Sequence, residues 1–349
     1  MHKQRTRPPL SNAPLYPLTF SPVYQDYIWG GTRMQDTLGR RPETAICAES
    51  WDVSDRPEGQ SVVSNGALEG TTLRHLMQSR RRDLVGALKA DVDVFPLLIK
   101  IIDANKTLSI QVHPDDASAA QHGGEAKTEM WYVLDADTDA CVYAGFKAET
   151  TADAFKAAID DGMVADVLQK QPVRPGDVVF IPGGRIHAIG AGCLILEIQQ
   201  NSNTTYRVDD WGRLGVDGKP RDLHLDAASR VINWTDTASP MQKAERLGRA
   251  TREREEWRLL SCDHFYLGQI NMSVPTQLSS ADNTFEILFC KSGTARIAAG
   301  ETVVDLAPAT SCLIPANVTE YTLSSAVSDT AASVMRILPG PYYMDGQSA

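Results

Sequence analysis

The 349-residue sequence lacks the features that mark several specialised classes of protein. Its six cysteines are dispersed and include no CxxC pair, so we expect reduced, buried thiols instead of a disulfide framework or a sulfur-ligated zinc site. A membrane helix requires about 20 consecutive apolar residues, and no apolar run in the sequence approaches that length. The net charge of −10 argues against nucleic acid as the main partner, because phosphate backbones are bound by clustered Lys and Arg. We therefore expect a cytoplasmic protein with no nucleic-acid or membrane partner.

The first 14 residues, MHKQRTRPPLSNAP, are basic and rich in proline, but no apolar segment follows their charges. A signal peptide or a membrane anchor needs such a segment, so neither is predicted. We expect residues 1–14 to form a disordered leader.

The rest of the chain contains short Val/Ile/Leu runs among 25 glycines and 19 prolines, a pattern typical of many short strands joined by turns. Apolar residues at helical spacing predict helices over residues 73–88 and 151–168. The charged stretch 243–258 is predicted to be a solvated linker helix before a C-terminal unit. The predicted strands cover residues 61–64, 95–102, 108–113, 130–134, 178–181 and 193–199.

Two segments of the first part of the chain resemble segments of the last part. TEMWYVLDADTDACVYAG, from Thr128, is similar to FEILFCKSGTARIAAG, from Phe285. RPGDVVFIPGGRIHAIG, from Arg174, is similar to LAPATSCLIPANVTEYTL, where Glu320 takes the place of His187. A repeat of this length predicts two related β barrels in tandem, the second without a metal. The alternative is a chance similarity between two β hairpins.

The segment LSIQVHPDD carries the clearest chemical signal. Alternate side chains of a strand share a face, so Ser109, Gln111 and His113 point together while Ile110 and Val112 point away. Three polar groups on one face, backed by apolar residues on the other, are costly to bury unless that face lines a site.

Two further segments add ligand types to this set. KTEMWYVL places Lys127, Glu129 and Trp131 on one strand face, and GDVVFIPGGRIHAIG carries His187 just after a Pro-Gly-Gly turn. Two histidines and one carboxylate, with a carbonyl oxygen from Gln111 as a fourth ligand, suit Zn²⁺ with one position left open, as in catalytic sites. We predict one zinc ion per chain.

Each of these residues alone has an ordinary structural explanation, such as a surface histidine after a turn or a solvated strand glutamate. The order QxH, then Glu, then GDxxxxPxGxxxH is, however, the two-part pattern of cupins. The remaining histidines have no ligand-like neighbours, apart from the one in the loop AAQHGGEA that leads to Lys127. These histidines are His2, His75, His122, His224 and His264.

Several longer stretches resemble type I phosphomannose isomerases, especially the short bacterial form. They are YIWGGTRM, AESWDVSD, FPLLIKIIDANKTLSIQVHPDD, AKTEMWYVL, PGDVVFIPGGRIHAIG and ILEIQQNSNTTYRVDDWGR, between about Tyr27 and Arg213. The resemblance implies a mainly β fold of tandem cupin (double-stranded β-helix, or jelly-roll) barrels with a few short helices. We expect a catalytic barrel over residues 15–240 and a second, metal-free barrel over residues 241–349.

The resemblance also implies roles for individual residues. Zinc would be bound by Gln111, His113, Glu129 and His187. Arg207, in NSNTTYRVDDWGR, matches the family's active-site arginine, and further site-lining residues match Lys100, Ser109, Lys127 and Glu197. Longer members carry a large helical insertion between the glutamate and the second histidine ligand, where this chain has only the helix predicted over residues 151–168. Any substrate contact made by that insertion is therefore in doubt.

The implied reaction interconverts D-mannose 6-phosphate and D-fructose 6-phosphate through an enediolate, so a hexose 6-phosphate is the expected small-molecule partner. Lys127, Lys100 and Glu197 are candidates for the proton-transfer base. Apolar neighbours would raise the pKa of Glu197, although this carboxylate could instead orient another site residue. Arg207 is always charged and is favoured for binding the enediolate or the phosphate.

Three alternatives remain at this point. Arg207 could be a surface residue paired with Asp209 or Asp210. The metal set could serve a cupin oxygenase that uses Fe(II), or the chain could be a non-catalytic cupin that binds sugar phosphates. The oligomeric state is not predicted.

Overall fold

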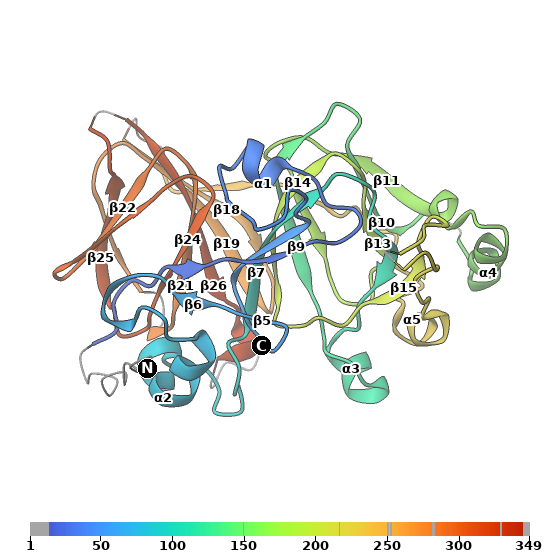
Figure 1. The fold of residues 1–349 in the computed structure, drawn as a ribbon, viewed down its shortest axis with the longest axis horizontal. Helices are drawn as coiled ribbons and strands as arrows, with labels where there is room; N and C mark the ends of the chain where they lie inside the picture. The colour runs from blue at the N-terminus through green and yellow to red at the C-terminus, as the bar shows by residue number, and fades with distance from the viewer. Residues whose placement is uncertain are drawn as a thin grey trace, which may run out of the picture.

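The computed structural model describes residues 14–148, 150–215, 217–249, 251, 253–280, 283–328 and 330–344. The leader predicted for residues 1–14 therefore lies, except for Pro14, outside the described residues. Two β barrels stand side by side in Figure 1, with a few short helices around them. The predicted fold class, mainly β with tandem cupin barrels, is confirmed. Among the described residues, no helix is long and apolar enough to cross a membrane.

The first barrel consists of a seven-stranded sheet, in the order β16-β12-β9-β14-β7-β3-β2, and a five-stranded sheet, in the order β11-β10-β13-β8-β15. Neighbouring strands pair antiparallel throughout both sheets. The strands are β2 (Val23–Gln25), β3 (Glu49–Val53), β7 (Leu97–Ala104), β8 (Ile110–Val112), β9 (Glu129–Ala136), β10 (Cys141–Phe146), β11 (Leu168–Pro172), β12 (Val178–Ile181), β13 (His187–Ile189), β14 (Cys193–Gln200), β15 (Tyr206–Asp209) and β16 (Met241–Gln242).

The second barrel consists of a six-stranded sheet, in the order β17-β18-β19-β26-β21-β24, and a four-stranded sheet, in the order β20-β25-β22-β23. Its strands are β17 (Glu245–Leu247), β18 (Arg254–Ser261), β19 (Phe265–Met272), β20 (Thr276–Ser279), β21 (Glu286–Ser292), β22 (Ala295–Ala299), β23 (Thr302–Leu306), β24 (Thr310–Ile314), β25 (Glu320–Ser325) and β26 (Ala332–Pro339). Two small ribbons complete the strands: β1 (Phe20–Ser21) with β6 (Val62–Val63), and β4 (Asp55–Arg56) with β5 (Gly59–Gln60).

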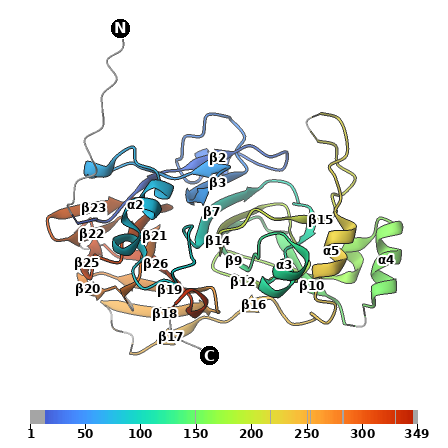
Figure 2. The same cartoon turned by 90° about the horizontal axis from the view of Figure 1, so that it is seen from below.

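The helices are short and lie outside the barrels. Figures 1 and 2 show α4 and α5 on the side of the first barrel that faces away from the second. The helix predicted over residues 151–168 is shorter than expected, because Gly162, with φ +68°, follows it and the chain continues as a 3-10 turn. The helices are α1 (Arg33–Asp36), α2 (Leu73–Val85), α3 (Asp116–His122), α4 (Ala152–Asp160) and α5 (Leu225–Val231), and the 3-10 turns are η1 (Gly66–Leu68), η2 (Val164–Val167) and η4 (Pro341–Tyr343).

The prediction of a linker helix over residues 243–258 is wrong. This stretch forms β17 and the start of β18, which pair antiparallel with Arg246 opposite Trp257. Its many charged residues favour a helix by propensity alone, but β18 also pairs along its length with β19. Pairing with a neighbouring sheet overrides local propensity, and the charged side chains of β17 lie at the sheet edge, where solvent reaches them.

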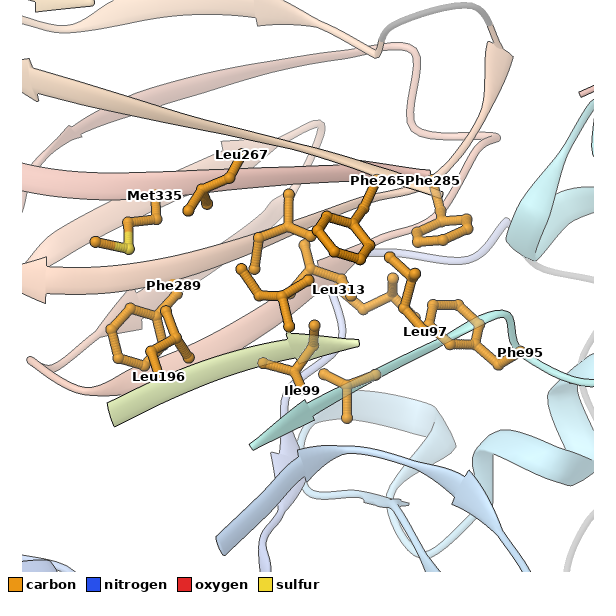
Figure 3. Close-up of a cluster of buried hydrophobic side chains, with 14 of the residues drawn as sticks. Phe95, Leu97, Ile99, Leu196, Phe265, Leu267, Phe285, Phe289, Leu313 and Met335 are labelled. Atoms are coloured by element: carbon orange, nitrogen blue, oxygen red, sulfur yellow. The ribbon is translucent and has the colours of Figure 1, made fainter. Parts of the chain in front are cut away.

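The barrels share a core between their larger sheets. Figure 3 shows Ile99 of β7 and Leu196 of β14 pointing toward side chains of the second barrel, among them Phe289 and Leu313. All eight residues of β7 are buried, because one face of the strand contacts the second barrel and the other faces the interior of the first. Since strand side chains alternate, the same packing directs Lys100 into the first barrel.

The two barrels agree in the register of their strand pairs as well as in strand order. β9 and β12 place Glu129 opposite Ile181, and β21 and β24 place Glu286 opposite Ile314. The same comparison across the other strand pairs supports an internal repeat over a chance likeness of two hairpins. The equivalent positions, first barrel before second, are Glu129 and Glu286, Gln111 and Ser279, His187 and Glu320, and Glu197 and Arg336.

The carboxylate inside the second barrel is neutralised by a protein cation. Glu286 is fully buried, and Arg336 donates to its Oε1 and Oε2 over 2.7 Å each. The hydroxyl of Tyr321 donates to Oε2 over 2.9 Å. Two parallel hydrogen bonds from a guanidinium are a strong and geometrically specific way to hold a buried carboxylate.

We expect the Arg336→Met variant to lose stability. It leaves the Glu286 carboxylate buried without its cation, which typically costs about 3–5 kcal/mol. Urea denaturation should show this loss in the free energy of unfolding. The double variant Arg336→Met/Glu286→Leu should recover most of the loss, because it removes the charge that lacked a partner. A single variant as stable as the wild type would show that the ion pair contributes nothing.

Candidate functional site

Three neighbouring strands of the smaller sheet bring polar side chains into one row inside the first barrel. His187 of β13 lies opposite Gln111 of β8, and Gln111 lies opposite Arg207 of β15. Side chains directly opposite each other on paired strands point to the same face of the sheet. The sheet thus brings Gln111 next to His187, which lies 76 positions later in the sequence, and next to Arg207, which lies later still.

Glu129 and His113 complete a compact cluster with His187. The Nε2 atom of His187 lies 3.3 Å from Oε1 of Glu129, and the Nε2 atom of His113 lies 3.7 Å from Oε2. One potential ligand atom from each of the three residues lies within 4.8 Å of the others, and all three side chains are buried. Two imidazole nitrogens and a carboxylate oxygen at this spacing can hold one metal ion.

Both histidines are oriented by backbone carbonyls. Nδ1 of His113 lies 2.7 Å from the oxygen of Thr204, and Nδ1 of His187 lies 2.8 Å from the oxygen of Arg185. Burial lowers the pKa of His187 to about 3, and burial together with the nearby Lys127 lowers the pKa of His113 well below its ordinary value. Neutral rings that donate through Nδ1 present the lone pair of Nε2 to the cluster, which is the form that binds metals.

Glu129 provides the test of whether a cation fits here. Neither of its carboxylate oxygens, both fully buried, accepts a hydrogen bond from a described residue, although the Nζ atom of Lys127 lies 2.8 Å from Oε2. Burial raises the pKa of Glu129 above its ordinary value even with that ammonium nearby. A cation between this carboxylate and the two imidazoles would satisfy all three groups, so the residues fit a metal ion.

Gln111 lies beside the cluster with its amide nitrogen inward. Its Nε2 atom is 3.4 Å from Nε2 of His113 and 3.4 Å from Nε2 of His187, while its Oε1 atom accepts from the hydroxyl of Ser109 over 3.1 Å. Half a turn of the amide would direct the oxygen to the cluster. The position of Gln111 is therefore suitable for a ligand, whereas the orientation of its amide is not.

The Pro-Gly-Gly turn brings the His187 strand against the His113 loop. The amide of Gly184 donates to the carbonyl of His113 over 2.7 Å. A Cβ atom on Gly183 would lie 2.5 Å from the Cα atom of Asp115. Only glycine allows this close approach of the two backbones, so the turn helps to set the distance between the two histidines.

Lys100 and Glu197 form a buried ion pair on the larger sheet. The two residues lie opposite each other on β7 and β14, with Nζ 3.1 Å from Oε2 of Glu197 and 3.5 Å from Oε2 of Glu49. Burial opposes the charge of Lys100, but the two carboxylates outweigh this effect and raise its pKa. Burial also opposes the charge of Glu197, but Lys100 and Lys127 outweigh it and lower the pKa of this carboxyl.

The expectation that apolar neighbours in the sequence raise the pKa of Glu197 is therefore wrong. The two ammonium groups come from β7 and from the loop before β9, and Trp131 donates to Oε1 of Glu197 over 3.0 Å. All of these interactions stabilise the carboxylate form. Glu197 is thus an anion that holds Lys100.

A cavity of ≈ 310 Å³ connects these groups. Of the site residues expected from the sequence, those that line this cavity are Lys100, Ser109, Gln111, Lys127, Glu129, His187, Glu197 and Arg207. His113 belongs to the metal cluster. The polar and aromatic lining residues that the sequence alone did not reveal as functional are Tyr27, Trp29, Glu49, Asn203, Thr205 and Arg221. Glu49 could have been found, because the segment ESW on β3 repeats the spacing of EMW on β9.

Arg207 lies in this cavity and not in a surface ion pair. Its Nη1 atom donates to the carbonyl of Asp222 over 2.8 Å, and its Nε atom is buried without a hydrogen-bond partner among the described residues. It forms no ion pair with a residue that the structure describes, so the predicted alternative of a pair with Asp209 or Asp210 is not found. Burial and the nearby Arg221 lower the pKa of Arg207, as expected for a cation that lacks an anion.

Among the other histidines, two have structural roles that the sequence did not reveal. Nδ1 of His224 accepts from the amide of Arg207 over 3.1 Å. His264 is buried in the second barrel and lies 3.1 Å from a carboxylate oxygen of Asp116 in α3. His122, at the end of α3, does not contribute to the metal cluster.

Comparison with known proteins agrees with this site. Residues 18–150 match the family described as phosphomannose isomerase type I, catalytic domain, and residues 255–333 match the family described as mannose-6-phosphate isomerase, cupin domain. The chain is 36% identical over 309 residues to mannose-6-phosphate isomerase ManA of Bacillus subtilis, which covers 88% of this chain and 95% of that protein. It is 42% identical over 217 residues to the mannose-6-phosphate isomerase of Streptococcus mutans, which covers 62% of this chain and 67% of that protein.

A solved structure agrees as well. The crystal structure of the mannose 6-phosphate isomerase from Bacillus subtilis matches with a TM-score of 0.83 and 28% sequence identity, over 93% of this chain and 100% of that one. Sequence similarity along nearly the whole chain, a matching fold and the family match that contains the QxH and Glu segments point to the same group of proteins. The chain belongs to the type I phosphomannose isomerase family.

Proposed function

We propose that this chain is a mannose-6-phosphate isomerase that interconverts D-mannose 6-phosphate and D-fructose 6-phosphate. The observation that carries the proposal is the row His187, Gln111, Arg207, which sets a permanent cation next to the metal cluster in one cavity. The cavity volume of ≈ 310 Å³ is at the lower end of the range of small-molecule sites. The relatives whose sequences match most of this chain are named as mannose-6-phosphate isomerases.

The metal that we propose is Zn²⁺, held by His113, His187 and Glu129, with Gln111 as the fourth ligand after its amide turns. Nitrogen and oxygen donors without a thiolate suit zinc in a catalytic site, where a position is left open. When bound, zinc supplies a Lewis acid that polarises a carbonyl oxygen. Ser109, which holds the Gln111 amide, and Lys100 are proposed to line the substrate site.

The proton transfer between C1 and C2 of the sugar needs a group that can both accept and return a proton. Lys100 is poorly suited, because the two carboxylates of Glu197 and Glu49 raise its pKa, and Glu197 is poorly suited, because Lys100 and Lys127 lower its pKa. We therefore propose Lys127 for this role. Its Nζ atom lies 3.1 Å from Nε2 of His113 and 2.8 Å from Oε2 of Glu129, within the cluster that would face the reacting carbons. Glu197 then acts by holding Lys100.

Loss of a proton from the sugar leaves an enediolate, whose negative oxygen needs a fixed positive partner. Arg207 fits this role, because it is always charged, lies next to Gln111 and has a buried Nε donor with no partner among the described residues. A guanidinium held by the carbonyl of Asp222 is oriented before the substrate arrives.

A coupled assay for fructose 6-phosphate formed from mannose 6-phosphate tests the proposed function. We expect turnover by the protein as purified with zinc, loss of turnover with a chelator, and recovery when zinc is restored. Tight binding of hexose phosphate without turnover would support a non-catalytic cupin instead. Turnover that requires iron and O₂ would support an oxygenase.

We further propose a catalytic unit over residues 15–240, to whose larger sheet β16 (Met241–Gln242) adds an edge strand, and a metal-free unit over residues 241–349. The second unit has Glu320 in place of His187, Ser279 in place of Gln111 and a guanidinium already bound to Glu286. None of these groups leaves a neutral imidazole for a metal.

The expected metal content is therefore one equivalent of zinc per chain. Elemental analysis of the purified protein measures it directly, and the double variant His113→Ala/His187→Ala should contain almost none. The variant Glu320→Ala, which changes the equivalent position of the second barrel, should keep the full equivalent. Two equivalents in the wild type, with one retained in the double variant, would contradict the prediction.

A further inference from the structure

The two ends of the cavity differ in the charge that their residues offer. At the buried end, the ammonium groups of Lys100 and Lys127 each lie within 3.1 Å of a carboxylate, that of Glu197 or Glu129. Glu49 adds a second carboxylate, 3.5 Å from the ammonium of Lys100. Each lysine at this end is therefore already paired with a carboxylate, so neither is a free cation for a small dianion such as phosphate.

The other end is lined by half-buried arginines. Arg207 and Arg221 both line the cavity. Their exposure to solvent is intermediate between that of Lys100, which is buried, and that of Asn203, which is exposed. Two neighbouring guanidinium groups repel each other unless an anion lies between them. The described residues of this end thus form a positively charged opening to the cavity.

One buried carboxylate organises these cations. Asp210 is only 6% exposed, and it accepts hydrogen bonds from both Arg221 and Arg213. The bond from Nε of Arg221 to Oδ2 is 2.8 Å long. Arg213 also donates to the carbonyl of Thr107, and among the described residues it is Arg221 and not Arg213 that lines the cavity, so Arg221 is the residue that Asp210 fixes at the cavity wall.

Arg221 keeps hydrogen-bonding capacity after this pairing. Asp210 occupies its Nε and Nη2 atoms, and no described residue accepts from Nη1. The guanidinium of Arg207 likewise donates only through Nη1, to the carbonyl of Asp222, among the described residues. Among the described residues, Asp210 is the carboxylate that is hydrogen-bonded to this group of three guanidinium groups, so this end of the cavity is complementary to a further anion.

We propose that Arg221, positioned by Asp210, holds the phosphate group of the substrate, while Arg207 faces the reacting carbons. This inference rests on the proposed isomerase function, since it assumes a hexose 6-phosphate. In that substrate the phosphate on C6 lies at the far end from C1 and C2. With C1 and C2 at the metal cluster, the phosphate extends toward the half-buried end of the cavity. The segment that follows β15 thereby supplies a phosphate contact in a chain without the large helical insertion.

The test uses inorganic phosphate as the probe and the zinc-loaded, full-length protein. The variant Arg221→Ala should bind phosphate roughly 10- to 100-fold more weakly in calorimetric titrations, the usual effect of losing a charge-assisted hydrogen bond. The KM for mannose 6-phosphate should rise by a similar factor with little change in kcat, because a phosphate contact is the same in the ground state and the transition state. The matched control is Arg174→Ala, which removes one positive charge from a side chain that is 86% exposed.

Unchanged phosphate affinity in a folded Arg221→Ala variant would overturn the proposal. If that variant does not fold, Arg221→Lys replaces it: a lysine can stay paired with Asp210 but loses the planar fork, so phosphate binding should again weaken, and affinity equal to the wild type would overturn the proposal. A wild-type protein without isomerase turnover whose phosphate binding still depends on Arg221 would refute the proposed function and support the anion site.

Discussion

The variant Glu129→Gln is expected to lose zinc affinity by more than the roughly 10- to 100-fold that follows the loss of an outer partner of a metal ligand. The substitution keeps the size of the side chain but replaces a charged oxygen donor with a neutral amide. Glu129 lies beside two neutral imidazoles, so its charge is the main attraction that the cluster offers a cation. Equilibrium dialysis against zinc buffers measures the change.

The second barrel supplies a matched control. Glu286→Gln makes the same change at the equivalent position, where Arg336 is the cation. That variant should keep the zinc affinity of the wild type while losing stability. Equal zinc affinity in Glu129→Gln and the wild type would contradict the assignment of Glu129 as a ligand and make it a buried partner of Lys127.

The alternation of polar and apolar residues predicts which side chains around Gln111 face the interior of the barrel. Gln111 and His113 alternate with the buried Ile110 and Val112, and this period places both on the inner face of one strand. The Pro-Gly-Gly turn before His187 indicated a tight chain reversal, which in the structure brings the backbone of Gly183 against Asp115. Short-range patterns like these are set by the backbone itself and can therefore be read from one sequence.

The properties that depend on cross-strand neighbours could not be predicted in the same way. Glu197 has apolar neighbours along β14, but its environment is decided by Lys100 across the sheet. The charged stretch 243–258 favours a helix until β19 offers a strand to pair with. Arg221 is one of many arginines in the sequence, and only the fold brings its side chain to the cavity together with Asp210.

The two barrels show how one buried carboxylate can be used in two ways. Glu129 and Glu286 hold equivalent places in the strand register. In the second barrel the cation is a guanidinium from the adjacent strand, a fixed part of the protein. In the first barrel the adjacent strand carries Glu197 at that place, which is bound to Lys100. Glu129 has only the single ammonium of Lys127 beside one of its oxygens, so its carboxylate can also take a cation from outside. The change of charge at this strand position is therefore one of the differences between the two barrels that bear on metal binding, beside Glu320 in place of His187.

The variant Arg207→Ala is expected to keep its fold and its zinc and to lose activity by orders of magnitude. Removal of one preorganised donor to a developing negative oxygen typically lowers kcat by about 10²–10³. Arg207 lies beside Gln111 in the sheet but donates to none of the metal ligands, and its described hydrogen bond goes to the carbonyl of Asp222. Zinc content by elemental analysis and thermal unfolding should therefore resemble those of the wild type, whereas the coupled assay should show the loss.

The division of this loss between kcat and KM decides what Arg207 binds. A guanidinium that stabilises the enediolate acts mainly in the transition state, so kcat and kcat/KM should fall together. A guanidinium that only holds the phosphate would raise KM and leave kcat unchanged, the result expected for Arg221→Ala. Arg207→Lys should recover little, because the ammonium cannot reproduce the planar donor that Asp222 orients. Near-normal kinetics in a folded, zinc-loaded Arg207→Ala protein would rule out both roles, since a cation within the cavity would then contribute to neither binding nor catalysis.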